Sequence, residues 1–183
     1  MQEINVTPSQ EFIKECFEYC KSTGDLTWSV RPEYHFSEKR YCDSWNKNFA
    51  GRLLKGRTEK GYCRTSLTGK YYFIHRLIFK MMTGRDPLMI DHINGVPSDN
   101  RWENLRDVTA ADNSKNIKLS KRNKSGLLGV VKRSGSWRVR ITARNNRINL
   151  GSYGDYFEAA CARKSAENKF GFHENHGRIA QRG

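Results

Sequence analysis

A polar stretch at residues 89–105, MIDHINGVPSDNRWENL, places an Asp-His pair close to several asparagines. The imidazole of His92 has an ordinary pKa of about 6.5, so it can take a proton from water at neutral pH. The neighbouring carboxylate of Asp91 is a hard oxygen ligand, which suits Mg²⁺ or Mn²⁺ better than zinc. A base that generates hydroxide and a cation that stabilises charge on phosphate are what phosphodiester hydrolysis requires.

The elements around this pair are expected to bring another oxygen ligand close to it. The apolar run 88–90 predicts a short strand that ends at the Asp-His pair, and residues 104–108 predict a second strand. Residues 109–112 have the pattern of a capping box, which places Asn113 in the first turn of a helix. A strand, a loop, a second strand and a helix would therefore carry the amide oxygen of Asn113 towards the pair.

These residues resemble the HNH endonucleases of the phage and homing type, over roughly residues 60–118. The resemblance rests on His75-Arg76, Asp91-His92, Asn94-Gly95, Asn100-Arg101-Trp102-Glu103-Asn104-Leu105 and Asn113. It implies a ββα-metal fold in which Asp91 and Asn113 bind one divalent ion, Mg²⁺ or Mn²⁺, and His92 is the general base. Asn104 would brace the loop, and Asn113 stands where other members have histidine.

Two residues of the resemblance, His75 and Arg76, precede the Asp-His pair in the chain. His75 either touches the phosphate backbone or simply begins a helix, and it is a catalytic candidate beside His92. Arg76 is expected to contact DNA. The tautomer of His92 must be fixed by a partner on its other ring nitrogen, and Asn104 is the residue we expect there.

The charge of the chain points to a polyanionic partner. Its 183 residues include 33 Lys and Arg against 19 Asp and Glu, which gives a formal charge of +14 and a pI near 9.8. We expect double-stranded DNA as the partner, a monomer or a dimer assembled on DNA, and no small-molecule cofactor. Neither a membrane-spanning run nor a secretory signal is visible, so no membrane partner and a cytoplasmic location are predicted.

The five cysteines leave an alternative open. Cys16, Cys20, Cys42 and Cys63 could close a tetrahedral zinc site, although their spacings are irregular. We prefer reduced and partly buried thiols. No chemistry is predicted for the aromatic and basic residues 27–58.

Capping residues and apolar spacing predict a helix from Thr7 through Cys20. Residues 62–66 and 70–73 predict a hairpin, and a helix with Leu77 on its apolar face should end at Gly84. We expect three regions: 1–59, an N-terminal helix and an irregular region; 60–118, the nuclease core; and 119–183, a DNA-binding domain with a C-terminal tail.

The segment between Ser114 and Gly154 contains no Asp or Glu, although it is rich in Lys and Arg, and this asymmetry marks a separate unit. Three short strands are predicted within it, at 129–131, 137–143 and 147–150. A helix capped by Asp155 and lined with alanines should follow and lie on the small sheet.

This segment resembles the plant-type AP2 DNA-binding domain, over roughly residues 120–172. The resemblance rests on Ser125-Gly126, Gly129-Val130, Trp137, the strand Arg138 to Ala143, Leu150-Gly151, Tyr153 and Glu158-Ala159-Ala160. It implies a three-stranded antiparallel sheet in the major groove of DNA, with Trp137 either in the core or on a sugar or base. Alternation along the middle strand should turn its arginines towards DNA. The DNA-contact candidates are Arg133, Trp137, Arg138, Arg140, Arg144 and Arg147.

The sequence therefore predicts an α+β protein with a ββα-metal (HNH) nuclease core, followed by an AP2-like three-stranded antiparallel sheet plus helix. The predicted activity is metal-dependent hydrolysis of double-stranded DNA by a homing-type phage enzyme that nicks one strand per active site. One alternative is a DNA-binding regulatory protein with a catalytically inactive HNH core. Another is an RNA-binding module.

Overall fold

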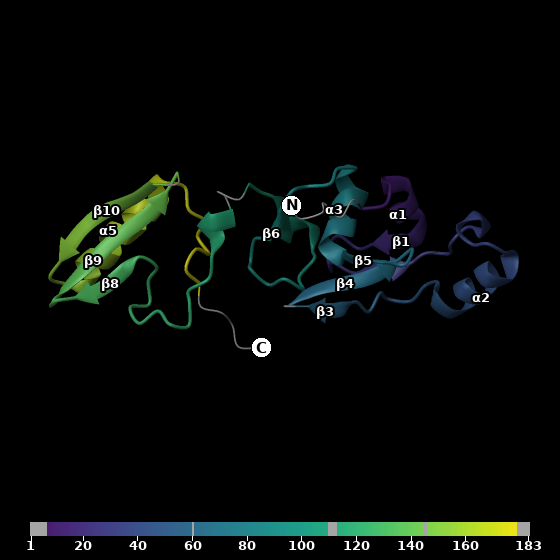
Figure 1. The fold of residues 1–183 in the computed structure, drawn as a ribbon, viewed down its shortest axis with the longest axis horizontal. Coiled ribbons are helices and arrows are strands. Elements are labelled where there is room, and N and C mark those ends of the chain that lie inside the picture. Colours follow the sequence, from purple (N-terminus) through teal and green to yellow (C-terminus); the bar gives the residue numbers. More distant parts are fainter. Residues whose placement is uncertain (1–6, 60, 110–112, 145, 179–183) are drawn as a thin grey trace. The chain divides into compact units, whose positions relative to one another are not determined.

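The computed structural model describes residues 7–59, 61–109, 113–144 and 146–178. The chain forms two compact units, Met1–Asp107 and Val108–Gly183, called the first and second unit below. Each unit has its own helices and strands (Figure 1). Each also has its own apolar core. Across the described ranges, no helix combines the length and the apolar character that crossing a membrane requires.

The first unit packs two of its helices, α1 and α3, against short antiparallel sheets. Its core is formed by buried residues that come from α1, α3 and the strands around them. The elements are α1 (Gln10–Cys16), β1 (Phe17–Tyr19), β2 (Leu26–Trp28), η1 (Glu33–His35), α2 (Lys39–Phe49), β3 (Arg57–Glu59), β4 (Tyr62–Leu67), β5 (Lys70–Phe73), α3 (Ile74–Thr83), β6 (Ile90–His92), η2 (Trp102–Asn104) and β7 (Leu105–Asp107).

The hairpin and the helix that follows it form as the sequence predicts. Strands β4 and β5 pair antiparallel, with Leu67 opposite Lys70 beside the turn. Helix α3 buries Leu77 and Ile78 and ends where Gly84 adopts the left-handed conformation, with φ 72°. The alternation of strand residues and the apolar period of the helix thus suffice to predict this part of the fold.

The predicted N-terminal helix is wrong at both ends. The N-cap is Ser9, whose side chain accepts a hydrogen bond from the Phe12 N–H, and the helix ends at Cys16. Residues 17–19 instead form β1 and pair with β2, so that Phe17 lies opposite Trp28. Cys16 and Cys20 therefore do not share a helix face, because a strand separates them.

Residues 27–58, for which no role was predicted, contain a packed aromatic cluster around Arg31. The guanidinium carbon of Arg31 lies 4.8 Å from the ring centre of Phe36 and 4.9 Å from that of Trp45. Trp45 in turn meets Trp28 edge to face, with ring centres 5.0 Å apart. These contacts attach α2 to β2, so this region has a structural role in the first unit.

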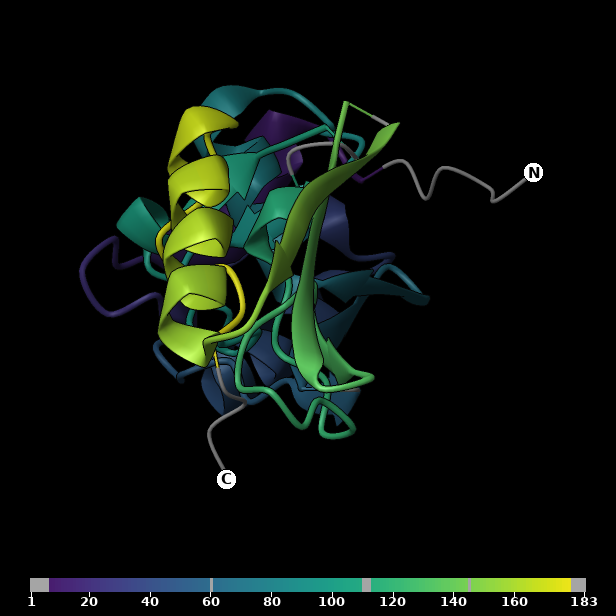
Figure 2. The same ribbon diagram turned by 90° about the vertical axis from the view of Figure 1, so that its left-hand side faces the viewer.

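The second unit consists of an antiparallel sheet, with β9 in the centre, and one long helix. Figure 2 shows α5 lying along one face of this sheet. The helix begins at Asp155, whose carboxylate accepts hydrogen bonds from the N–H groups of Phe157 and Glu158. The elements are η3 (Ser114–Asn116), β8 (Val130–Arg133), β9 (Ser136–Ala143), β10 (Asn146–Tyr153) and α5 (Tyr156–Lys169).

The alternation predicted for β9 is confirmed. Val139 and Ile141 are buried, whereas Arg138 and Arg140 between them are exposed. Buried Val130 and Ala159 pack with Val139 into the small core of this unit. The arginines of β9 therefore project from the face of the sheet that α5 does not cover.

A buried ionic network fastens α5 to the middle strand. The Arg163 guanidinium donates from Nε to the Glu167 carboxylate (2.8 Å) and from Nη1 to the Arg140 carbonyl (2.6 Å). Its Nη2 lies 3.1 Å from Nε2 of His176. Burial lowers the pKa of His176, which keeps the imidazole neutral and able to accept from Arg163.

The end of the described chain returns to the segment that precedes the sheet. The C-terminal segment, residues 173–178, donates from His173 N–H to the Lys115 carbonyl (3.3 Å) and from Gly177 N–H to the Ile117 carbonyl (2.8 Å). Arg178 Nη1 also donates to the side-chain oxygen of Asn116 at 2.6 Å. Hydrogen bonds therefore join residues 115–117 of the second unit to residues 173–178.

Substituting Gly129 with alanine should destabilise the second unit by more than the usual penalty of a left-handed residue. Gly129 has φ +73°, and an added Cβ would overlap the Arg140 carbonyl oxygen and lie 2.8 Å from Arg163 Nη1. Gly135 is the matched control, since it has φ +79° and open space around it. In urea titrations, Gly135→Ala should cost about 1 kcal/mol and Gly129→Ala about 3 kcal/mol. Equal losses would contradict the predicted overlap.

Candidate active site

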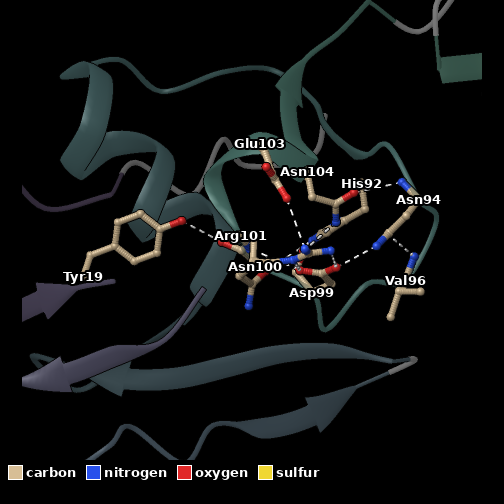
Figure 3. Close-up of polar contacts among 9 residues, drawn as sticks. All are labelled: Tyr19, His92, Asn94, Val96, Asp99, Asn100, Arg101, Glu103 and Asn104. Atoms are coloured by element: carbon tan, nitrogen blue, oxygen red, sulfur yellow. Dashed lines mark hydrogen bonds and ion pairs between the residues drawn. The ribbon is translucent and has the colours of Figure 1, made fainter. Parts of the chain in front are cut away.

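The loop that follows His92 is held by a dense set of hydrogen bonds (Figure 3). Asn94 begins its turn, with the side-chain oxygen accepting from Val96 N–H at 2.8 Å and the side-chain nitrogen donating to Asp99 at 2.6 Å. Arg101 donates to both carboxylate oxygens of Asp99, at 2.9 and 2.7 Å, and this lowers the pKa of Asp99 to about 2. The loop therefore holds its shape through ionised side chains as well as through its turns.

Asn104 connects the two ends of this loop. Its side-chain oxygen accepts from the Asn94 N–H at 2.8 Å, and its side-chain nitrogen donates to the Asp99 carbonyl at 2.7 Å. Its own carbonyl accepts from the Ile93 N–H at 2.9 Å. These bonds fit the bracing role that the resemblance implies for Asn104.

The partner of the His92 ring differs from the one predicted. Nε2 of His92 lies 3.2 Å from the side-chain oxygen of Asn100, whereas Asn104 uses its amide on the loop backbone. Asn100 is itself fixed by the Tyr19 hydroxyl, which donates to the Asn100 carbonyl at 2.7 Å (Figure 3). The expectation failed because Asn100 reaches this position through a contact with a strand 81 residues away.

The His92 ring is buried and neutral at physiological pH. Desolvation lowers its pKa, and the hydrogen bond to Asn100 and the charge of Asp91 oppose this without reversing it. Because a carboxamide oxygen can only accept, the contact with Asn100 favours the tautomer that carries its proton on Nε2. A neutral imidazole with an assigned tautomer is the form that can take a proton from water.

An aromatic cluster surrounds this imidazole. The ring centre of His92 lies 5.3 Å from that of His75 and 5.7 Å from that of Tyr62. His75 stacks on Phe73 with centres 5.5 Å apart and planes tilted by 17°. Sequence reasoning identified His75 but missed Tyr62, because its proximity follows only from the pairing of β4 with β5.

His75 is buried, and desolvation lowers its pKa to about 3. Its Nδ1 has no hydrogen-bond partner among the described residues. The ring therefore stays neutral in the folded protein across the whole physiological range. A neutral nitrogen beside His92 suits a contact with substrate or water better than an ionic contact with phosphate.

This burial predicts a loss of stability in acid. The unfolded His75 has a pKa of about 6.5 and the folded one about 3, so between these values the unfolded chain binds more protons. The free energy of unfolding should therefore fall as the pH is lowered from 7 to 4, by on the order of 3 kcal/mol from this residue. His75→Phe, which keeps a ring in the cluster, should remove that part of the loss in urea titrations at the two pH values. If His75→Phe lost as much stability between pH 7 and pH 4 as the wild type, burial of His75 would not be the cause of the loss.

Asp91 lies beside His92 on β6 and forms an ion pair across the hairpin. Its Oδ2 accepts from Arg106 Nη2 at 2.6 Å and from Arg106 Nε at 3.0 Å. The two residues face each other in the register of β6 and β7. Arg106 was not predicted as a site residue, because the register that places it opposite Asp91 cannot be read from the sequence.

The remaining predicted ligand, Asn113, belongs to the second unit and directly precedes η3. Its backbone N–H donates to the Thr109 carbonyl at 2.9 Å. The helix start predicted at residues 109–112 includes residues 110–112, which lie outside the described part of the chain. Asp91 and His92 belong to the first unit.

The zinc alternative finds no support in the described ranges, where no three His, Cys, Asp or Glu side chains lie close enough together to hold a metal ion. Cys16 and Cys42 are buried free thiols, Cys20 is exposed and Cys63 is half-buried. Burial raises the pKa of Cys16 to about 11, which keeps it protonated. Within the described part of the chain, these cysteines are free thiols that belong to no group able to hold a metal ion.

The predicted DNA-contact residues fall into different surroundings. Most of them lie on the second unit, where a hollow of about 350 Å³ is lined by Val131, Arg133, Arg138, Val139, Arg140, Arg147 and Asn149. Arg144 is exposed in the turn between β9 and β10. Trp137 is half-buried against Tyr156, with ring centres 4.8 Å apart. Arg76 of the first unit donates to the Pro87 carbonyl at 2.7 Å and so connects the beginning of α3 to the segment that precedes β6.

Comparison with known proteins places the site in a matched region. A family model described as HNH endonuclease matches residues 72–115, which include His75, Asp91, His92, Asn104 and Asn113. Protein 3.8 of Escherichia phage T7 is 40% identical over 65 residues, which is 34% of this chain and 54% of that protein. The chain thus spans about half the length of this relative. No solved structure matches the chain. Residues 72–115 are therefore similar to an HNH endonuclease domain, and a phage protein is among the relatives of the chain.

Proposed function

We propose that this protein is a metal-dependent endonuclease of the HNH type that hydrolyses phosphodiester bonds in double-stranded DNA. The observation that supports this best is the neutral His92, held by Asn100 beside Asp91 within the matched region. In this proposal, His92 takes the proton from the attacking water. The phage relative fits the homing or phage type expected from the sequence.

The side chains that would hold a divalent ion are Asp91 and Asn113. A carboxylate accepts through about four lone pairs, so Asp91 can bind an ion while Arg106 occupies one side of Oδ2. Oxygen donors of this kind fit Mg²⁺ or Mn²⁺. When bound, the ion would stabilise negative charge on the phosphate and on the leaving oxygen.

The exposed arginines of the second unit would hold the duplex. Arg138 and Arg140 on β9 and Arg147 on β10 project from the open face of the sheet. Arginine can bind phosphate or contact guanine through two hydrogen bonds, and a sheet face of this kind fits the AP2-like mode that the sequence suggests. The products would be a 5′ phosphate and a 3′ hydroxyl, with one strand nicked per active site.

The test is nicking of supercoiled plasmid by the purified full chain with Mg²⁺, with Mn²⁺ and with EDTA. We expect conversion to open circles with either ion and none with EDTA. Retention of duplex DNA without conversion under any divalent ion would favour the regulatory alternative. Stronger retention of structured RNA than of duplex DNA would favour the RNA-binding alternative.

Binding to duplex DNA should weaken steeply with salt. If about six phosphates are neutralised, log affinity against log salt concentration should fall with a slope of about −5. Replacing Arg138 and Arg140 together by alanine should change this slope from about −5 to about −3, because two phosphate contacts are lost. Fluorescence anisotropy of a labelled duplex measures the affinity at each salt concentration. Arg40→Ala is the control, because Arg40 is paired with Glu38 on the first unit. A slope that the double variant leaves unchanged would exclude the sheet as the phosphate-binding surface.

A further inference from the structure

Arg106 is placed where it must interact with any cation that Asp91 binds. The register of β6 and β7 sets the two residues directly opposite each other, and two guanidinium nitrogens contact Oδ2 of Asp91. The side chains retain 31% of their exposure at Arg106 and 10% at Asp91. The Arg106 side chain is thus partly exposed, whereas that of Asp91 is largely buried.

Stability gives little reason for this pair. Asp91 is buried, and a buried ion pair is usually no more stabilising than a well-packed apolar pair in its place, although the loss of one partner alone is costly. The core around it is formed by other residues, since Leu105 on the same strand is buried among the apolar side chains of the first unit. The arginine is therefore better explained by the chemistry of Asp91 than by packing of the hairpin.

The charge of Arg106 works against the binding of a divalent cation. A unit positive charge about 5 Å from a divalent ion raises its dissociation constant about tenfold even at the dielectric constant of water, and more when partly buried. The guanidinium is charged at every physiological pH, so this effect does not depend on titration. A DNA phosphate, in contrast, offers the guanidinium two acceptor oxygens and a negative charge.

We propose that Arg106 makes cation binding at Asp91 depend on DNA. Without DNA, the guanidinium stays on Oδ2 of Asp91 and keeps the affinity for Mg²⁺ or Mn²⁺ low. When duplex DNA is bound, the guanidinium exchanges Asp91 for a backbone phosphate near the bond to be cut. The same residue then releases the carboxylate for the cation and contacts the substrate. This inference rests on the proposed endonuclease function.

The test is calorimetric titration of the full chain with Mn²⁺ in the absence of DNA. Arg106→Gln, which keeps a polar side chain of similar length without charge, should bind Mn²⁺ at least about tenfold more tightly than the wild type. Arg106→Lys keeps the charge, so its affinity should stay low. Arg85→Gln is the matched control. Arg85 Nη1 lies 3.7 Å from Oδ2 of Asp107, which follows Arg106 on β7, so this variant removes a neighbouring positive charge and should leave the affinity for Mn²⁺ unchanged.

Plasmid nicking separates the two proposals. If Arg106 contacts the phosphate, Arg106→Gln should nick at least about tenfold more slowly at saturating Mn²⁺, despite its tighter binding of the ion. If the wild type nicks DNA and Arg106→Gln binds Mn²⁺ no more tightly than the wild type does, the gating role of Arg106 is overturned and the endonuclease function still stands. A wild type that neither nicks nor binds Mn²⁺ with DNA present would overturn the endonuclease function, and the gating role with it.

Discussion

His92→Ala should lower metal-dependent nicking of supercoiled plasmid by about a thousandfold and leave the affinity for duplex DNA within about twofold of the wild type. His92 is buried on β6, with Nε2 held by Asn100 and a pKa lowered by desolvation. Without the imidazole, the attacking water loses the base that we propose for it. DNA affinity should persist because the arginines of the second unit are untouched.

Two further variants distinguish a loss of the base from a loss of folding. His92→Gln keeps a polar side chain at the position and should lose activity as the alanine variant does. His173→Ala is the matched control, since His173 lies in the C-terminal segment of the second unit and accepts from the Asn175 N–H. Nicking by both His92 variants at the wild-type rate, measured over a range of Mn²⁺ concentrations, would remove His92 from the mechanism.

Arg163→Ala should destabilise the second unit by about 3 to 5 kcal/mol. The residue is 4% exposed and its partner Glu167 is 6% exposed, so removing the guanidinium leaves a buried carboxylate with less compensation. The Arg140 carbonyl would also lose the hydrogen bond from Arg163 Nη1, and Nε2 of His176 would lose its contact with Arg163 Nη2. Losses of this size arise when one member of a buried ion pair is removed.

Lys164→Ala is the comparison for Arg163→Ala, because Lys164 pairs with the same Glu167 carboxylate. Lys164 binds the other oxygen of Glu167 at 2.8 Å, but its side chain is half exposed, so its removal should cost less than about 1 kcal/mol. Trp137 is the single tryptophan of the second unit. Its own signal in fluorine NMR of the chain labelled with 5-fluorotryptophan should therefore report on the urea unfolding of that unit. Equal destabilisation by the two variants would show that burial of Arg163 does not determine its contribution.

Local patterns predicted much of the fold. The alternation of β9 and the caps of α3 and α5 depend on residues within a few positions of each other, and the structure has them as predicted. The apolar period that suggested a helix through Cys20 was misleading. The pairing of Phe17 with Trp28, with Gly24 at φ +82° in the turn between the strands, outweighs helical spacing there.

The candidate site shows the same division between local and distant information. Asp91, His92 and Asn104 could be identified because they stand in one short stretch with a recognisable spacing. Asn100 and Arg106 could not be given their contacts from the sequence. The first depends on a hydrogen bond from Tyr19 and the second on the exact register of two strands. Long-range contacts of this kind are invisible to periodicity and capping rules.

The hydrogen bonds between residues 115–119 and 173–178 have a consequence for how the second unit opens. Leu119 N–H donates to the Arg178 carbonyl at 2.9 Å, in addition to the bonds at Lys115 and Ile117. Neither segment can leave without exposing backbone groups of the other to solvent, so the two should fray together rather than one at a time.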